Sequence, residues 1–182
     1  MSVNAVNPAA AAVKIIFKPW QASGTAMVCI HQTFFEMPSA ISIQNATAAD
    51  FDAVCALLSA NNLPSADLNP LLDHFLVALE EGKVVAVMGI DRYGMAGLLR
   101  SAAVSASHRN AGLAAALLQQ LLETAKQTGI AGLYLITNTA ENYFSKKGFV
   151  KISRELVPAA VLQSEEFNGL CPASSVIMHR AV

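Results

Sequence analysis

The residues best suited to chemistry in this sequence form a short turn between an apolar run, residues 98–104, and a segment with leucines at helical spacing. The turn consists of His108, Arg109, Asn110, Ala111, Gly112, Leu113, Ala114 and Ala115. The first N–H groups of a helix lack acceptors within it and carry a partial positive charge, which suits a phosphate or pyrophosphate group. Gly112 lets such a group approach the backbone closely, and Ala114 keeps the next turn small. The turn therefore predicts an anion site, whose main-chain donors matter more than the Arg109 side chain.

A second chemical signal is Arg100, a charged residue inside the apolar run. A buried guanidinium needs a partner, because an unpaired charge is costly to remove from water. The sequence leaves two partners open: the carboxylate of a bound molecule, or an Asp or Glu of the chain itself.

The elements that must position these residues follow from hydrophobic period and turn signals. Strands are predicted at residues 40–44, 74–79, 84–90, 98–104, 133–137, 149–153 and 174–179. A helix is predicted after the capping pair Thr47 and Asp50, ending before Asn61. Further helices are predicted at residues 69–74, 112–126, 140–147 and 158–163, with Gly129 and Gly148 as stop signals. This order predicts an α/β fold with a central mixed, twisted β-sheet and helices on both faces.

Composition limits the function classes. The 182 residues carry 12 basic and 13 acidic side chains, a net charge of −1, which argues against a nucleic-acid partner bound through its phosphates. The mean hydropathy of +0.44 is high, but polar residues interrupt the apolar stretch near the N-terminus, so no membrane span or signal peptide is expected. The three cysteines, Cys29, Cys55 and Cys171, are far apart, so neither a metal site nor a metalloid site is expected. We expect a cytoplasmic monomer or homodimer.

The chain is expected to divide at about residue 38. Residues 1–38 lack sustained periodicity, whereas residues 39–182 are regularly patterned and form the predicted domain. Met37 stands just before the first predicted strand, so it is a possible alternative start.

Two motifs carry a resemblance to a known family. The turn contains Arg109-x-x-Gly112-x-Ala114, which resembles the coenzyme A signature of GNAT acetyltransferases. Residues 140–149, with Tyr143, Phe144 and the pair Gly148-Phe149, resemble that family's second motif. The resemblance covers residues 40 to about 180 and implies the GNAT fold with acetyl-CoA as cosubstrate.

The resemblance also implies roles for particular residues. Residues 109–115 would hold the pyrophosphate, Ala103 and Val104 the pantetheine arm and the acetyl carbonyl, and Phe144 would line the cofactor. Arg100, Ser101 and Thr137 would lie at the acceptor. For proton transfer the candidates are Tyr143, Glu141, Asp91 and His74, for each of which an ordinary surface role is the alternative. Phe144 stands where the family's common tyrosine acid is found, and Tyr143 points elsewhere on its helix, so neither aromatic residue is expected to be an indispensable acid.

Two local resemblances narrow the expected substrate. Residues 135–144 resemble the acetyltransferase domain of N-acetylglutamate synthases, and the tail after Pro158 resembles small acetyltransferases of bacterial arsenic-resistance operons. They imply a small amino acid, or an analogue of one, as the amine acceptor, with glutamate-like compounds expected. A non-catalytic acyl-CoA sensor of the same fold is the alternative.

Overall fold

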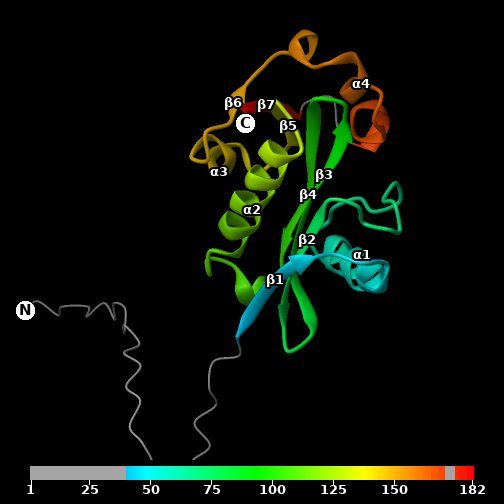
Figure 1. Ribbon diagram of the computed structural model, residues 1–182, viewed down its shortest axis with the longest axis vertical. Coiled ribbons are helices and arrows are strands. Elements are labelled where there is room, and N and C mark those ends of the chain that lie inside the picture. The colour runs from blue at the N-terminus through cyan, green and yellow to red at the C-terminus, as the bar shows by residue number, and fades with distance from the viewer. Residues whose placement is uncertain (1–39, 171–174) are drawn as a thin grey trace, which may run out of the picture. The chain divides into compact units, whose positions relative to one another are not determined.

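The computed structural model describes residues 40–170 and 175–182, which belong to one compact unit with a seven-stranded sheet (Figure 1). The strand order is β1-β2-β3-β4-β5-β7-β6. The strands are β1 (Ile41–Asn45), β2 (Phe75–Glu80), β3 (Lys83–Tyr93), β4 (Ala96–Val104), β5 (Gly132–Thr137), β6 (Val150–Lys151) and β7 (Val176–Ala181). The pair β4–β5 is parallel and the other neighbouring pairs are antiparallel, so the prediction of a mixed sheet is confirmed.

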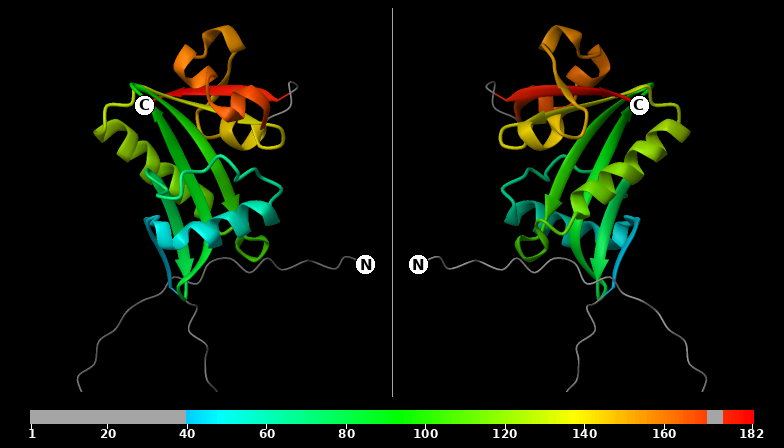
Figure 2. Two further views of the ribbon diagram at one scale, coloured as in Figure 1. Left: turned by 90° about the vertical axis from the view of Figure 1, so that its right-hand side faces the viewer. Right: turned by 90° about the vertical axis from the view of Figure 1, so that its left-hand side faces the viewer.

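Helices cover both faces of this sheet, as Figures 1 and 2 show. The helices α2 (Leu113–Gln127) and α3 (Glu141–Ser145) pack on one face, and α1 (Phe51–Ala60) and α4 (Ala159–Leu162) on the other. The largest apolar cluster lies under α2 and α3. The opposite face has two smaller clusters, one under α1 and one under α4 with the following π-helical turn η4 (Glu166–Leu170). The α/β prediction is therefore confirmed.

Local sequence signals explain the two long helices. Thr47 and Asp50 form the expected capping box, with the Thr47 N–H donating to Asp50 Oδ2 at 2.8 Å, directly before α1 begins. Helix α2 buries five of the six residues of the predicted stripe, Leu113, Leu117, Leu118, Leu121 and Ala125, and the sixth, Leu122, is half-buried. Gly129 follows it with a φ of +77°, a left-handed conformation in which glycine avoids the strain of a side chain.

The predicted helix at residues 69–74 is wrong. The Asn69 side chain accepts a hydrogen bond from the Leu71 N–H at 3.0 Å, and Leu72 and His74 have φ values of +52° and +61°. This local turn replaces the helical hydrogen-bond pattern. The strand predicted at 149–153 is also shorter than expected, since β6 covers only Val150–Lys151.

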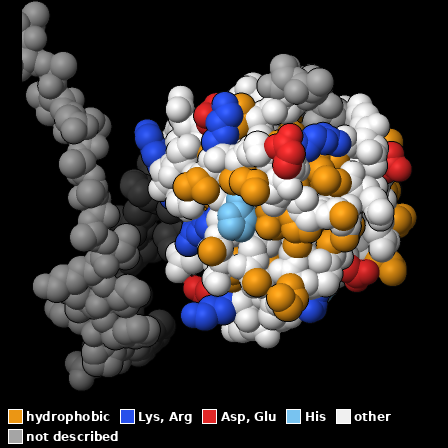
Figure 3. Space-filling model, turned by 90° about the horizontal axis from the view of Figure 1, so that it is seen from above, with side chains coloured by type: hydrophobic (Ala, Val, Ile, Leu, Met, Phe, Trp, Pro, Cys, Tyr) orange, Lys and Arg blue, Asp and Glu red, His pale blue; other side chains and the backbone are white. Residues whose placement is uncertain are grey.

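The end of the unit that carries β6, β7 and α4 is seen in Figure 3, where apolar side chains gather on the surface. Met95, in the β3–β4 turn, and Leu156 are among the large apolar side chains that are exposed. None of the helices in the described part of the chain is long and apolar enough to span a membrane. The expected extension, residues 1–38, lies outside the described residues, so the division at residue 38 stays a prediction.

A tight contact at Gly97 fixes how β4 meets β5. A Cβ atom at this position would lie 2.8 Å from Ile90 Cγ2 and 2.8 Å from Leu133 Cδ2, both on buried residues. We expect Gly97→Ala to lower the free energy of unfolding by about 1–3 kcal/mol, because the core must shift to admit the methyl group. Urea denaturation measures this change. The control is Gly169→Ala, since Gly169 has no neighbouring atom within 4 Å; a loss at Gly97 no larger than the control's would contradict the account.

Candidate functional site

An open cleft of about 370 Å³ lies at the N-terminal end of α2. Seven of the residues singled out in the sequence line it: Val104, Arg109, Asn110, Gly112, Leu113, Ala114 and Ala115. Tyr143 and His108 complete the lining. The structure therefore brings most of the predicted turn and one predicted aromatic residue into a single hollow.

The cleft lies at the C-terminal end of β4, beyond the point where β4 leaves β5. The parallel pairing joins Ala96–Leu98 to Gly132–Tyr134 and ends there, although β4 continues to Val104 and β5 to Thr137. Strands that part in this way leave main-chain donors and acceptors along the inner edge of each strand. An extended ligand with amide groups can pair with such an edge.

A β-bulge interrupts β4 at the same level. Arg100 pairs with Gly89 and Ala103 with Val87, so that Ser101 and Ala102 together oppose the single residue Met88. Ser101 has a φ of +56°, and its hydroxyl is buried without a hydrogen-bond partner among the described residues. A bulge next to a cleft redirects side chains and frees main-chain groups, which is a common arrangement at binding sites.

The turn itself is held in a left-handed conformation at two positions, Asn110 with a φ of +65° and Gly112 with a φ of +83°. Ala115 and Ala116 both donate N–H groups to the Gly112 carbonyl at 3.0 Å. The N–H groups of Leu113 and Ala114 have no acceptor within the helix, because they lie in its first turn. These two residues line the cleft, so their donors are available to an anion there.

Some of the predicted cofactor residues have other contacts. The Arg109 side chain donates from Nη2 to Asn61 Oδ1 at 3.0 Å, at the end of α1. Ala103 is buried under α1, Ala111 is exposed outside the cleft lining, and Phe144 lies in the core, 5.4 Å from Phe149 between ring centroids. The Arg109 side chain is thus engaged at α1, and binding of phosphate by the main chain of the turn stays a prediction.

Tyr143 reaches the cleft, while its neighbour Phe144 does not. The Tyr143 hydroxyl is buried and has no hydrogen-bond partner among the described residues. Burial raises the pKa of Tyr143 above the ordinary value for a phenol, which makes it a weaker proton donor.

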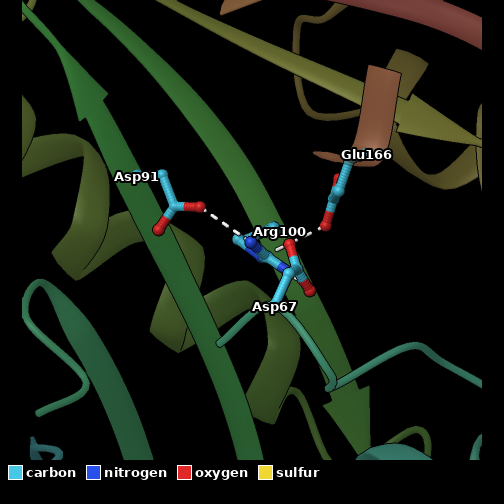
Figure 4. A network of polar contacts seen from close by, with 4 residues as sticks. All are labelled: Asp67, Asp91, Arg100 and Glu166. Carbon is cyan, nitrogen blue, oxygen red and sulfur yellow. Dashed lines mark hydrogen bonds and ion pairs between the residues drawn. The ribbon is translucent and has the colours of Figure 1, made fainter. Parts of the chain in front are cut away.

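A charged network surrounds Arg100 on the opposite face, shown in Figure 4. Its guanidinium donates from Nη2 to Asp67 Oδ1 at 2.6 Å and from Nη1 to Asp91 Oδ2 at 2.8 Å. Arg100 Nε lies 3.1 Å from Glu166 Oε1 and forms an ion pair with it, but the Nε–H bond does not point at that oxygen. These partners are the second of the two alternatives left open by the sequence, carboxylates of the chain itself.

This network joins four segments and is short of positive charge. Asp67 comes from the loop after α1, Asp91 from β3, Arg100 from β4 and Glu166 from η4. Three carboxyl groups face one guanidinium whose side chain is only 3% exposed. Burial raises the pKa of Glu166 to about 7, with Asp67 and Asp91 adding to the effect and Arg100 opposing it. A proton on Glu166 therefore relieves the excess negative charge near neutral pH.

The remaining candidates from the sequence lie apart from one another. The Thr137 hydroxyl accepts a hydrogen bond from the Ala140 N–H at 2.9 Å before α3, and Glu141 is half-buried in the first turn of that helix. His74 is exposed and adjoins Thr124. Thr124 lies ten residues beyond Ala114 on α2, or about 15 Å at 1.5 Å per residue. His74 is therefore far from the cleft.

Cys55 is free and packs at the edge of the cluster under α1, while Cys29 and Cys171 lie outside the described residues. Within the described ranges, no group of three or more His, Cys, Asp or Glu residues is arranged to hold a metal ion.

Sequence reasoning missed three residues of these two sites: Asp67, Glu80 and Glu166. Asp67 and Glu166 lie in irregular segments where no periodic pattern marks the buried side. His108 belongs to the predicted turn, but its partner Glu80, at the end of β2, is brought near only by the folded sheet.

Comparisons with known proteins agree with this geometry. Residues 72–151 match the family model described as "Acetyltransferase (GNAT) domain". N-acetylglutamate synthase from Neisseria gonorrhoeae, complexed with coenzyme A and N-acetyl-glutamate, has a TM-score of 0.68 and 20% identity, over 79% of this chain and 35% of that chain. A GNAT-family acetyltransferase from Staphylococcus aureus Mu50 has a TM-score of 0.65 and 21% identity, over 78% of this chain and 99% of that one. Rv2747 from Mycobacterium tuberculosis, in a complex with CoA, has a TM-score of 0.65 and 20% identity, over 78% and 99%.

These structural similarities establish a shared fold. The chain spans about a third of the length of the gonococcal synthase.

The Glu166 carboxyl predicts a specific pH dependence of stability. Its pKa is about 7 in the folded protein against an ordinary value of 4.5, so the folded state binds the proton more tightly. The resulting stabilisation is complete below pH 4.5 and is lost as the pH rises through 7, which amounts to about 2 kcal/mol between pH 5 and 8. Glu166→Gln removes the titrating proton, so its stability relative to the wild type should rise by about that amount from pH 5 to 8.

Urea denaturation at both pH values measures this difference. The matched control is Glu165→Gln, because Glu165 is the exposed neighbour and its variant should follow the wild type. A constant difference between Glu166→Gln and the wild type across this range would contradict the charge balance described for the network.

Proposed function

We propose that this chain, whose residues 72–151 match the GNAT acetyltransferase family model, transfers the acetyl group of acetyl-CoA to the amine of a small amino acid or amino-acid analogue. The observation that carries the proposal is the cleft at the end of β4, beyond the point where β4 and β5 part, lined by the left-handed Gly112 turn and the start of α2. The donors of Leu113 and Ala114 would hold the pyrophosphate, and the free edge of β4 near Val104 would pair with the amides of the pantetheine arm.

The reaction then needs little from side chains. The neutral amine attacks the thioester carbonyl, the new N–C bond forms, and the C–S bond breaks with its electron pair leaving on the thiolate. Main-chain N–H groups at the bulge, near Ala102 and Ala103, are suited to stabilise the oxygen that becomes negative. The proton lost by the amine passes to a nearby base or to water.

Tyr143 supports cofactor binding more than proton transfer. Its raised pKa makes the phenol a weaker acid than a thiol with a pKa of about 8.5, so transfer of its proton to the departing thiolate is unfavourable. Solvent in the open cleft is the proton source that we propose for the thiolate.

The acceptor side is proposed to lie on the face with the Arg100 network. The excess of carboxyl groups there favours an incoming ammonium group, and Asp91 is the most exposed member, with a side chain 31% exposed. The unpartnered Ser101 hydroxyl at the bulge is available for a further hydrogen bond. Among the compared structures, the one with N-acetyl-glutamate and coenzyme A supports an amino acid in this role. The arsenic link depends on the resemblance of the tail alone and stays a prediction.

A sensor that binds acyl-CoA without transferring the acetyl group is the second candidate. It is favoured by Phe144, which stands at the position of the family's common tyrosine acid and is packed into the core. The two candidates share the cofactor cleft and differ only in turnover.

The cofactor site is tested by Gly112→Asp. An aspartate at this position adds a negative charge where the phosphates are proposed to bind, so the affinity for acetyl-CoA should fall at least tenfold, a loss of about 1.4 kcal/mol. Two controls separate charge from backbone strain. Gly112→Asn has the same shape without the charge, and Gly129→Asp places the same residue at a left-handed glycine beyond the other end of α2. Titration calorimetry that gives near-normal affinity for folded Gly112→Asp would reject the site.

Turnover is tested by the release of free CoA from acetyl-CoA with a panel of amines. The panel contains glutamate, glutamine, the phosphinic analogue of glutamate and a plain aliphatic amine of similar size. We expect acetylation of at least one amino acid to exceed that of the aliphatic amine by tenfold or more. Binding of acetyl-CoA without turnover on any amine would favour the sensor, and faster acetylation of the aliphatic amine would reject an amino-acid acceptor.

A further inference from the structure

A cluster of polar side chains ties down the loop that leads from β4 into the cleft. His108 Nδ1 lies 2.6 Å from Ser105 Oγ and 2.8 Å from Ser107 Oγ. His108 Nε2 lies 2.9 Å from Glu80 Oε2, at the end of β2. The His108 side chain is 17% exposed and the Glu80 side chain 30% exposed, so the pair is largely shielded from solvent.

The contacts of the imidazole fit both of its charge states. A carboxylate only accepts hydrogen bonds, so Nε2 carries a proton and donates it to Glu80. In the neutral ring, Nδ1 accepts a hydrogen bond from a serine hydroxyl. In the protonated ring, Nδ1 donates to a serine oxygen instead. His108 therefore joins the first residues of the loop to β2 whether or not it is charged.

The segment that follows His108 needs such support. Asn110 and Gly112 both have left-handed φ values, and a non-glycine residue in that conformation stores strain that the surroundings must offset. The Ala111 N–H donates back to the His108 carbonyl at 3.4 Å. On the other side, Arg109 is bonded to Asn61, whose side chain donates to the Leu57 carbonyl at 2.9 Å. The loop is thus anchored to the end of β2 through His108 and to the end of α1 through Arg109.

The location of the cluster suggests which part of a ligand it affects. His108 lines the cleft together with Gly112, Leu113 and Ala114, the residues proposed to hold phosphates. The main-chain groups proposed to stabilise the acetyl oxygen are at the β4 bulge, which precedes Val104 in the sequence and lies outside the lining of the cleft.

We propose that His108, held by Glu80 and Ser105, is a positioning residue that fixes the β4–α2 loop in the conformation that binds the phosphates of acetyl-CoA. The proposal rests on the proposed function, because it takes the occupant of the cleft to be coenzyme A. It predicts that His108 acts on the phosphate-bearing half of the cofactor and leaves the thioester half unaffected.

The test compares coenzyme A with a ligand that lacks the phosphates, using the full chain. Calorimetry measures the Kd for CoA and for pantetheine, and kinetics measure kcat and KM for acetyl-CoA and for S-acetylpantetheine. In His108→Ala we expect the Kd for CoA and the KM for acetyl-CoA to rise about tenfold, while kcat/KM for acetylpantetheine changes by less than about twofold. A loss of the thioester machinery or of the fold would lower activity with both substrates.

A double-mutant cycle tests whether Glu80 acts through His108. Glu80→Gln should weaken CoA binding less than His108→Ala, and the double variant should be no weaker than His108→Ala alone, since neighbours in one network are not additive. His179→Ala is the matched control, because that ring stacks on Tyr134 at 4.7 Å and lines a different hollow. The control should leave the preference for acetyl-CoA over acetylpantetheine unchanged.

The possible outcomes separate this proposal from the proposed function. Equal losses with both substrates, or unchanged CoA affinity in His108→Ala, would overturn the positioning role while the proposed function stands. A wild-type chain that binds CoA no more tightly than pantetheine would overturn both. If the protein binds CoA without turnover, and His108→Ala lowers the affinity for CoA more than that for pantetheine, the positioning role is supported and the sensor is favoured.

Discussion

The parallel pairing of β4 with β5 extends over three residues and ends at Leu98 and Tyr134, and the candidate site depends on that short contact. Below it, Gly97 allows the two strands to meet with Ile90 and Leu133 packed closely around it. Beyond it, β4 continues to Val104 without pairing with β5. The bulge at Ser101 and Ala102 interrupts the pairing of β4 with β3, and the loop into α2 lines the end of the cleft. Longer pairing would occupy the main-chain groups that the proposed cofactor needs.

Two side-chain networks hold the walls of this opening. His108 and Arg109 anchor the loop at the start of α2 to the ends of β2 and α1. On the other face, Arg100 connects the loop after α1, β3, β4 and η4 through three carboxyl groups. Both networks join segments far apart in the sequence, so each fixes the relation of elements that the sheet alone does not determine. The Arg100 network is sensitive to pH, since the Glu166 carboxyl must lose its proton inside an already negative cluster.

The sequence predicted the elements with strong local signals and missed those set by tertiary contacts. The α2 stripe, the Thr47–Asp50 cap and the Gly112 turn depend on neighbouring residues, and all three are found as expected. The helix expected at 69–74 was wrong because the Asn69 side chain forms a competing turn. Arg100 was recognised as a buried charge, but its partners Asp67 and Glu166 lie 33 and 66 residues away, and no period or motif connects them. Phe144, which was expected to line the cofactor, packs in the core, and its neighbour Tyr143 lines the cleft instead. This difference follows from how α3 packs on the sheet, which a motif alone does not reveal.

The central claim is that the opening between β4 and β5 binds coenzyme A with its phosphates at the start of α2. The most direct measurement is a titration of the isotope-labelled protein with CoA, followed by amide chemical shifts in solution NMR. The account predicts that the largest changes occur at Val104 and in residues 109–115, with smaller ones at Tyr143. Changes confined to the hollow around Tyr134 and His179, or no saturable change at millimolar CoA, would contradict it.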